Sequence, residues 1–342
     1  MRIAVVASPV TPLRRAQLGG AQAFVCDLAL GLVRRGHEVT LHCAEKSELE
    51  GVRLVMVPAP DDAASALVMP GGREPSPAPG VARALAAMFD SIAASPVDVI
   101  SQHAFDAPAF ELARDMPVLH TLHLPPIVAA VTSAAGAVPA SRLATVSRSC
   151  LAEWRGAGVD VGQVLPNGVP ADSIPEVAVE RAALIAGRLS PEKGVEHAIA
   201  AARSIGLPVR VAGAHYDPAY ELDLSGTEMI GSVPRDQLRG LMSRSAVTVC
   251  AVRWEEPFGM VAAEAQMAGC PVAAYRRGAM AEVVEDGLSG RLAVPDDVAD
   301  LGRAISQCLD LDRAAVRASA VRRLGLEAAL DRYEAALLQA SR

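Results

Sequence analysis

The amino-acid sequence predicts an α/β fold with two Rossmann-like, doubly wound domains that face one another across a ligand-binding cleft. The chain has 342 residues, and chains of this length usually divide into two domains, because single hydrophobic cores stop growing near this size. Short β-rich runs alternate with helical patterns in both halves, which is typical of parallel sheets. Between the halves, prolines at 166, 170 and 175 and a glycine at 168 indicate a hinge.

The first half begins with a predicted strand at 2–7, RIAVVA, which is short, apolar and rich in β-branched residues. Further strands are expected, in chain order, at EVTLHC, RLVMV, VDVI, PVLHTL and RLATVS. Helical patterns cover 21–35 and 81–94. Because parallel strands need long crossover connections, usually helices, we expect these strands to form one parallel sheet.

The second half repeats this organisation after the hinge. Strands are expected at ALIAG, PVRVAG, TEMIG, VTVC and PVAAY, and helices at 195–204, 235–243 and 259–268. Helical patterns then dominate from residue 299 to the end. We therefore expect one domain at 1–168, a second at 169–325 and a final helix at 326–342.

Composition excludes several classes of function. The net charge is −7, whereas a nucleic-acid-binding protein needs a basic surface to neutralise phosphates. Apolar residues make up 51% of the chain, but no segment reaches about 18 uninterrupted apolar residues, so no membrane span is expected. The chain starts with a strand pattern rather than a signal peptide, and its six cysteines lack metal-binding spacing. We expect reduced cysteines, a cytoplasmic location and a function in the cleft.

The predicted helix at 259–268 is apolar on almost every face, yet it contains the carboxylate of Glu264. Such a helix must be buried against its sheet, and an unpaired buried carboxylate is costly. Helical side chains lean toward the N-terminus, so Glu264 can point back to the loop that carries Glu256. The first turn of this helix also offers backbone amides that suit phosphate. The alternative, that Glu264 reaches solvent or pairs with a neighbouring arginine, stays open.

Two cations follow a predicted strand in LIAGRLSPEKG. Arg188 comes directly after the strand, and Lys193 lies across a turn that contains Ser190 and Pro191. Both belong at the carboxyl end of a parallel strand, where open α/β sheets bind ligands. Either cation alone is more often a solvated surface charge, but together they can hold a diphosphate.

Two smaller patterns have open or ordinary interpretations. His103 and Asp106 follow a strand in SQHAFDAP, and both an acceptor-facing role and a surface role stay open. The triplet Asp310 to Asp312 resembles a metal-binding D-x-D pattern. It lies between two helical patterns, which favours a helix boundary with an aspartate cap.

Motifs along the chain resemble those of one family. The second half contains GRLSPEKG, EPFGMVAAEAQMAGCPV and GAMAEVVEDGLSGRL, in which Glu256 and Glu264 form an E-x7-E pattern. The first half contains the glycine pair Gly19 and Gly20, the histidine of LHTLHLPP, the strand end ATVSRS and the hinge motif LPNGVP. In this order the motifs resemble those of retaining glycosyltransferases of family 4, which have the GT-B fold.

This resemblance implies a nucleotide-diphosphate sugar donor that lies mainly against the second domain. The implied catalytic residues are His123, Arg188, Lys193 and Glu256. The implied donor-binding residues are Gly19, Gly20, Asn167, Arg188, Lys193, Phe258, Gly259, Met260 and Glu264. No metal ion and no cofactor are implied, and the final helix is expected to pack back on the first domain.

The resemblance also implies roles. Arg188 and Lys193 would bind the two phosphates and neutralise the leaving group, with backbone amides near Gly259 adding to this site. Glu264 would hold the ribose hydroxyls, and Glu256 would accept hydrogen bonds from the sugar.

His123 would contact the sugar from the first domain, and the Gly19–Gly20 pair would allow the backbone to approach the donor phosphate or the acceptor closely. The family retains anomeric configuration, with the acceptor attacking on the face from which the diphosphate leaves. The leaving phosphate oxygen takes the acceptor's proton. Glu256 and Glu264 are therefore expected to be binding groups and not an acid/base pair.

We therefore predict a retaining, hexosyltransferase-type glycosyltransferase that moves a sugar from a UDP-sugar to a hydroxyl of a soluble acceptor, such as a natural product, a sugar or a polyol. Membrane association is not expected, and the sequence does not predict the oligomeric state. One departure from the family pattern is Pro170 after NGV, where an acidic residue is usual. Two alternatives remain: a nucleotide-sugar epimerase of GT-B architecture, and a glycosyltransferase-like protein that binds nucleotide sugar without turnover.

Overall fold

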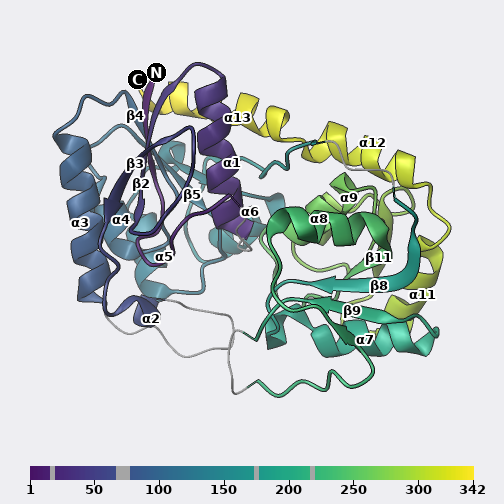
Figure 1. The fold of residues 1–342 in the computed structure, drawn as a ribbon. Helices are drawn as coiled ribbons and strands as arrows, with labels where there is room; N and C mark the ends of the chain where they lie inside the picture. The colour runs from purple at the N-terminus through teal and green to yellow at the C-terminus, as the bar shows by residue number, and fades with distance from the viewer. Residues whose placement is uncertain (16–19, 67–77, 173–176, 216–219) are drawn as a thin grey trace. The chain divides into compact units, whose positions relative to one another are not determined.

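The computed structural model describes residues 1–15, 20–66, 78–172, 177–215 and 220–342 (Figure 1). The chain divides into two compact units. Unit 1 comprises Met1–Gly168 and Leu326–Arg342, and unit 2 comprises Val169–Gly325.

Unit 1 contains a parallel sheet. Among its described residues, seven strands lie in the order β3-β2-β1-β4-β5-β6-β7. Their bounds are β1 (Arg2–Val6), β2 (Glu38–Ala44), β3 (Arg53–Val57), β4 (Val99–Gln102), β5 (Val118–Leu122), β6 (Leu143–Thr145) and β7 (Gln163–Val164). The strand order reverses direction between β1 and β4, which pair side by side. At such a switch point the carboxyl ends of neighbouring strands leave a crevice for ligands.

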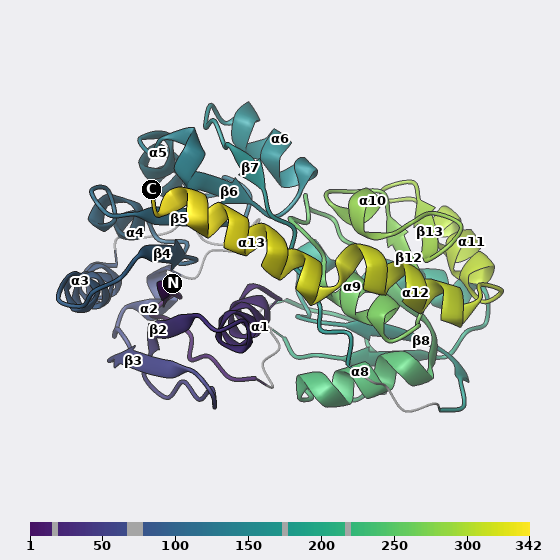
Figure 2. The ribbon, with the colours of Figure 1, turned by 90° about the horizontal axis from the view of Figure 1, so that it is seen from above.

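Helices cover both faces of this sheet (Figure 1). Their bounds are α1 (Gly20–Arg34), α2 (Ala63–Ala66), α3 (Pro79–Ala93), α4 (Ala107–Leu112), α5 (Ala129–Gly136), the 3₁₀ turn η1 (Ala140–Arg142), α6 (Arg148–Gly156) and α13 (Leu326–Ala340). The last helix, α13, packs beside α1 and over β4 and β5 (Figure 2). Its Tyr333 ring lies 5.4 Å from the ring of Phe24 in α1, and both side chains are fully buried. The end of the chain therefore completes the core of unit 1.

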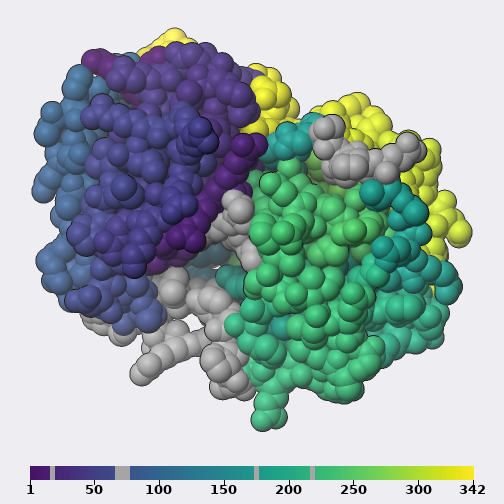
Figure 3. Space-filling view, in the orientation of Figure 1, coloured from purple at the N-terminus to yellow at the C-terminus, as the bar shows by residue number. Residues whose placement is uncertain are grey.

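One of the two edge strands of this sheet is β3. Two of its central residues, Leu54 and Val55, are partly buried, and the third, Met56, is 51% exposed. In Figure 3 the early part of the chain, drawn in purple and indigo, forms the face of unit 1 that is turned to the viewer. The strand is short, which limits the pairing that an open sheet edge invites.

Unit 2 contains a second parallel sheet. Six strands among its described residues lie in the order β10-β9-β8-β11-β12-β13. Their bounds are β8 (Glu180–Ala186), β9 (Val209–Ala212), β10 (Glu228–Met229), β11 (Ser245–Cys250), β12 (Val272–Tyr275) and β13 (Gly290–Ala293). The switch point of this sheet lies between β8 and β11, which pair side by side.

The helices of unit 2 again lie on both faces of the sheet. Their bounds are the 3₁₀ turn η2 (Pro191–Lys193), α7 (Val195–Ser204), α8 (Arg235–Arg244), α9 (Met260–Met267), α10 (Met280–Val283), α11 (Val298–Cys308) and α12 (Arg313–Leu324). The predicted aspartate cap between α11 and α12 is confirmed, because the carboxylate of Asp312 accepts a hydrogen bond from the amide of Ala314 at 2.9 Å.

The predicted α/β class is confirmed, but the sequence interpretation missed several short elements. The strands β7 and β13 were not predicted, nor were the helices α2, α4, α5, α6 and α10. In the part of the chain that the structure describes, no helix combines the length and the apolar character that crossing a bilayer requires.

Candidate functional site

The candidate site of unit 2 is built at the carboxyl ends of β8 and β11. After β8 the chain turns through Arg188 and η2 into α7, and after β11 it runs through the loop 251–259 into α9. Because these two strands are neighbours at the switch point, both loops start at the same place on the sheet edge.

Glycine allows the two loops to touch. Gly194 ends η2 with φ of +58°, and a Cβ at this position would lie 2.0 Å from the carbonyl oxygen of Ala251. Only glycine combines this left-handed backbone with so close an approach. Beside it, the amide of Arg253 donates to the carbonyl of Glu192 at 2.8 Å. The turn after β8 is therefore fixed against the loop after β11.

This contact brings Lys193 to Glu256. The Lys193 Nζ lies 2.6 Å from Glu256 Oε2 and 5.4 Å from the centre of the Trp254 ring. Trp254 Nε1 donates to the same Oε2 at 2.7 Å. An ammonium group has three donors and a carboxylate has about four acceptor positions. Both groups therefore keep hydrogen-bonding capacity for a ligand.

Arg188 is held by an acid from its own turn. Its Nη2 lies 3.5 Å from Oε1 of Glu192, and the same oxygen accepts a 2.6 Å hydrogen bond from Ser190 Oγ. The Glu192 side chain is buried, whereas the Arg188 side chain is 40% exposed. The buried carboxylate of Glu192 thus holds one nitrogen of the guanidinium group, while much of the Arg188 side chain is exposed to solvent.

The loop after β12 supports Glu256 from the other side. The carbonyl of Glu256 accepts from the Ala279 amide at 2.8 Å. Gly278 has φ of +57°, and a Cβ there would lie 2.3 Å from the Glu256 amide nitrogen. The Gly278 amide in turn donates to the carboxylate of Glu255 at 2.9 Å. The loops after β8, β11 and β12 therefore together fix the position of the Glu256 carboxylate.

Glu264 lies in the buried helix α9, as predicted, and it has a cationic partner. Its Oε1 accepts from Arg235 Nε at 2.5 Å, and both side chains are less than a tenth exposed. Arg235 is the first residue of α8, where the helix dipole disfavours a cation. Of the alternatives that the sequence left open, the structure shows the pairing with a neighbouring arginine.

The remaining predicted residues of unit 2 lie at the start of α9. Gly259 has φ of +92° and precedes the first helical residue, Met260. Phe258 is 4% exposed and Met260 is 8% exposed. The first amides of a helix have no partner within the helix, so this end of α9 offers donors next to the loop that carries Glu256.

In unit 1 two histidines lie together at the carboxyl ends of β4 and β5. His123 Nε2 lies 2.9 Å from His103 Nδ1, and His103 Nε2 lies 2.9 Å from Ser101 Oγ. His123 and His103 are 6% and 7% exposed, so the surface role left open for His103 is wrong. Burial lowers the pKa of His123 to about 4. Burial and the neighbouring His123 hold the pKa of His103 well below its usual range.

Four other residues of unit 1 were predicted for the site or had roles that the sequence left open. Gly20 is the exposed first residue of α1, whereas Gly19 lies outside the described residues. The side chain of Asn167 is buried, and none of the described residues gives its oxygen a hydrogen-bond donor. Asp106 precedes α4, and burial, opposed by a hydrogen bond from Ser8, raises its pKa to about 6.

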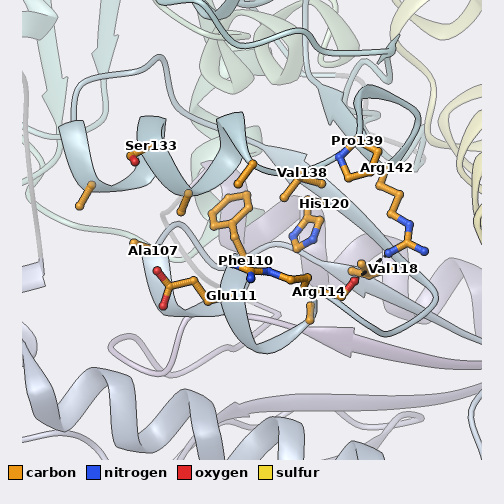
Figure 4. Close-up of a pocket in the computed structure, with 14 residues that line it drawn as sticks. Ala107, Phe110, Glu111, Arg114, Val118, His120, Ser133, Val138, Pro139 and Arg142 are labelled. Atoms are coloured by element: carbon orange, nitrogen blue, oxygen red, sulfur yellow. Dashed lines mark hydrogen bonds between the residues drawn. The ribbon is translucent and has the colours of Figure 1, made fainter.

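Unit 1 also contains a cavity of about 380 Å³ between α4, α5 and β5 (Figure 4). His120 borders it, with its ring stacked on Phe110 at 4.8 Å between centres. Burial, assisted by the charge of Arg142, lowers the pKa of His120 to about 3. The cavity extends toward Val118, the first residue of β5. It therefore lies toward the amino end of the strand, and none of the predicted site residues borders it.

Three residues of these constellations were missed by sequence interpretation. Glu192 sits between the two predicted cations, and an acid four residues after Arg188 was a signal that could have been used. Trp254 lies only two residues before Glu256, the residue to which it donates. Arg235 has no local signal of this kind, because tertiary structure brings it to Glu264 across 29 residues.

Comparison with known proteins gives matches over nearly the whole chain. Residues 174–323 match the family described as Glycosyl transferases group 1, and residues 18–173 match the family described as Glycosyltransferase Family 4. The D-inositol 3-phosphate glycosyltransferase of Mycolicibacterium smegmatis is 27% identical, over 93% of this chain and 86% of that protein. Glycogen synthase of Mycobacterium tuberculosis is 31% identical over 53% of this chain. That match spans about half of the relative, 48% of its length.

Solved structures give the same result for the fold. AviGT4, a glycosyltransferase involved in avilamycin A biosynthesis, superposes with a TM-score of 0.71 and 23% identity, over 99% of this chain and 98% of that chain. Anabaena HepE in complex with UDP and glucose superposes with a TM-score of 0.75 and 17% identity, over 98% and 99%. These matches confirm the predicted GT-B fold class.

Proposed function

Because the chain belongs to glycosyltransferase family 4, we propose that it is a retaining, hexosyltransferase-type enzyme that transfers a sugar from a UDP-sugar to a hydroxyl of a small soluble acceptor. The observation that carries this proposal is the contact of Lys193 with Glu256 at the switch point of the unit 2 sheet. This contact places a cation that can bind phosphate next to a carboxylate that can accept hydrogen bonds from sugar hydroxyls.

The diphosphate is proposed to lie between Arg188, Lys193 and the first amides of α9. Lys193 uses one donor on Glu256, and its other donors can bind phosphate oxygens. Arg188 offers a guanidinium that is well suited to phosphate geometry. Among the residues that the structure describes, no group of three or more His, Cys, Asp or Glu side chains is arranged to hold a metal ion.

The proposed transfer balances without a protein base. The bond between the anomeric carbon and the phosphate oxygen breaks, and a bond to the acceptor oxygen forms on the same face. The acceptor's proton moves to the leaving phosphate oxygen, so the products are the nucleoside diphosphate and the glycoside. Charge develops on the diphosphate, where fixed cations and amides stabilise it without reorganising.

Glu264 is proposed to hold the ribose hydroxyls. Its Oε1 is engaged by Arg235, and a carboxylate has two oxygens with about four acceptor positions between them, so the pair does not exhaust its capacity. Glu256 is proposed to accept from sugar hydroxyls in the same way. Support for the donor comes from Anabaena HepE, which was solved with UDP and glucose.

A hydroxylated small molecule is proposed as the acceptor. One relative named above is a D-inositol 3-phosphate glycosyltransferase and another is involved in the biosynthesis of a natural product, which supports a polyol, a sugar or a natural product. The choice among them depends on a few contacts that differ between relatives.

Donor hydrolysis tests the proposal. The full chain is incubated with UDP-, GDP- and ADP-sugars, and nucleoside diphosphate release is measured for wild type, Arg188→Ala and Glu256→Gln. We expect slow release from UDP-sugars, with each variant about a hundredfold slower, which is the usual effect of losing one electrostatic donor. Arg303→Ala is the matched control, because Arg303 is an exposed arginine of α11 that pairs with Asp300 of the same helix.

The outcomes separate the alternatives. Retention is read from the anomeric configuration of the glycoside formed with an added acceptor, and an inverted product would contradict the retaining reaction. Binding of UDP-sugar without any turnover, with acceptors present, would favour a binding protein. Conversion of the sugar to its epimer would favour an epimerase.

A further inference from the structure

A chain of three hydrogen-bonding side chains ends at His123 in unit 1. Ser101 Oγ lies 2.9 Å from His103 Nε2, and His103 Nδ1 lies 2.9 Å from His123 Nε2. Ser101 is fully buried and both histidines are nearly so. The last atom of the chain, His123 Nδ1, is buried without a hydrogen-bond partner among the described residues.

The two rings are held in place by packing. The His103 ring lies 6.1 Å from the ring of Tyr333, and the His123 ring lies 6.2 Å from the ring of Phe24. Because burial depresses the pKa of His103 and of His123, both rings are neutral near pH 7. A neutral imidazole carries one N–H and one acceptor nitrogen, so the direction of each hydrogen bond fixes the direction of the next.

Two directions are possible, and they differ in the number of unsatisfied groups. If Ser101 donates to His103 Nε2, then His103 donates from Nδ1 to His123 Nε2, and His123 carries its proton on Nδ1. In the reverse direction the Ser101 hydroxyl proton has no acceptor among the described residues, and His123 Nδ1 is still unsatisfied. A buried polar group without a partner, donor or acceptor, is costly. The first direction leaves one fewer such group.

We propose that Ser101 and His103 position His123 with its ring proton on Nδ1, so that this nitrogen is a hydrogen-bond donor for a substrate oxygen. The part concerning substrate rests on the function proposed above. His103 and Ser101 act through His123 and are positioning residues. The unsatisfied N–H gains its partner only when an oxygen of the bound substrate reaches it, which favours the bound state.

Nitrogen NMR of the histidine rings tests the positioning without any substrate. The full chain is labelled with ¹⁵N-histidine, and the His123 signals are assigned by their loss in His123→Gln. We expect wild type at pH 7 to carry the His123 proton on Nδ1. Ser101→Ala should give a mixture of tautomers, and Ser101→Thr, which keeps the hydroxyl, should restore the wild-type tautomer.

Ser47→Ala is the matched control, because Ser47 is a buried serine of unit 1 whose hydroxyl bonds elsewhere, to the carbonyl of Ala44. Its His123 signals should match those of wild type. In donor hydrolysis we expect kcat/KM to fall about tenfold in Ser101→Ala, the usual effect of one hydrogen bond. Ser101→Thr and Ser47→Ala should stay near wild type.

A His123 proton on Nε2 in wild type overturns the inference, and so does a tautomer that Ser101→Ala leaves unchanged. Failure of the proposed function has a different signature. Wild type would then carry the proton on Nδ1 but turn over no nucleotide sugar, which would remove the substrate role of His123 and leave its positioning by Ser101 and His103 supported.

Discussion

Arg235 Nε lies 2.5 Å from Oε1 of Glu264, and this ion pair is buried between the helices α8 and α9. The pair resolves a conflict in the sequence, where a carboxylate stands inside an apolar helix. It also places a cation in the first turn of α8, where the helix dipole opposes it. Each charge is tolerated because of the other.

Replacing Arg235 with methionine should therefore leave a buried carboxylate without its partner. We expect a loss of about 3 to 5 kcal/mol in the free energy of unfolding, measured by urea denaturation. Arg303→Met removes an exposed pair with Asp300 and should cost less than about 1 kcal/mol. The double variant Arg235→Met, Glu264→Met should recover most of the loss, and equal effects of Arg235→Met and Arg303→Met would contradict this account.

Gly194 should be far less tolerant of a side chain than Gly206. Both have positive φ, +58° and +67°, but a Cβ at Gly206 meets nothing within 4 Å, whereas one at Gly194 meets the carbonyl oxygen of Ala251 at 2.0 Å. Gly206→Ala should cost about 1 to 2 kcal/mol of stability from backbone strain alone. Gly194→Ala should cost at least about 2 kcal/mol more.

Thermal and urea unfolding of the two alanine variants check this difference. Equal stabilities would mean that the turn after β8 can move away from the loop after β11. Lys193 and Glu256 would then not be fixed together by backbone contact.

Trp254→Phe should weaken catalysis. The substitution keeps an aromatic ring beside Lys193 but removes the Nε1 donor to Glu256 Oε2. A hydrogen bond to a charged group is worth about 1.5 to 3 kcal/mol, so we expect at least a tenfold lower kcat/KM for donor hydrolysis. Trp154→Phe removes a buried Nε1 donor to the carbonyl of Leu124 in unit 1. It should reduce stability and leave kcat/KM near wild type, and a reversed pattern would contradict the role of Trp254.

His120 should make the protein sensitive to acid. Burial lowers its pKa in the folded state to about 3, below the value of about 6.5 in the unfolded chain. Its contribution to stability is therefore present above pH 6.5 and is lost as the pH falls toward 3. We therefore expect the stability advantage of His120→Phe over wild type, measured as the free energy of unfolding, to increase by about 2 kcal/mol between pH 7 and pH 5.

Urea denaturation at the two pH values measures this increase. The contributions of the other buried histidines to the pH dependence of stability cancel in the comparison, because both proteins contain them. His215→Gln, at an exposed position, should follow wild type. A constant difference between His120→Phe and wild type at both pH values would show that His120 does not bind its proton on unfolding.

Much of the fold could be predicted from the sequence, because long periodic segments carry their own signal. The helix predicted at 195–204 is α7 at the same residues, and the helix predicted at 259–268 is α9 within one residue at each end. The missed strand β13, GRLA, is short and contains a glycine and an arginine. It is a strand because it pairs with β12, and not because of local propensity.

The sequence by itself determined the order of the longer strands and helices, the turn that carries Arg188 and Lys193, and the burial of the helix around Glu264. These features depend on neighbours in the chain, through periodicity, turn chemistry and the lack of a polar face on α9. Only the tertiary structure decided the partners: Lys193 with Glu256 across 63 residues, Arg235 with Glu264 across 29, and His103 with His123 across 20. Which side chains meet at a sheet edge depends on strand order and register, and these are set by the packing of the whole unit.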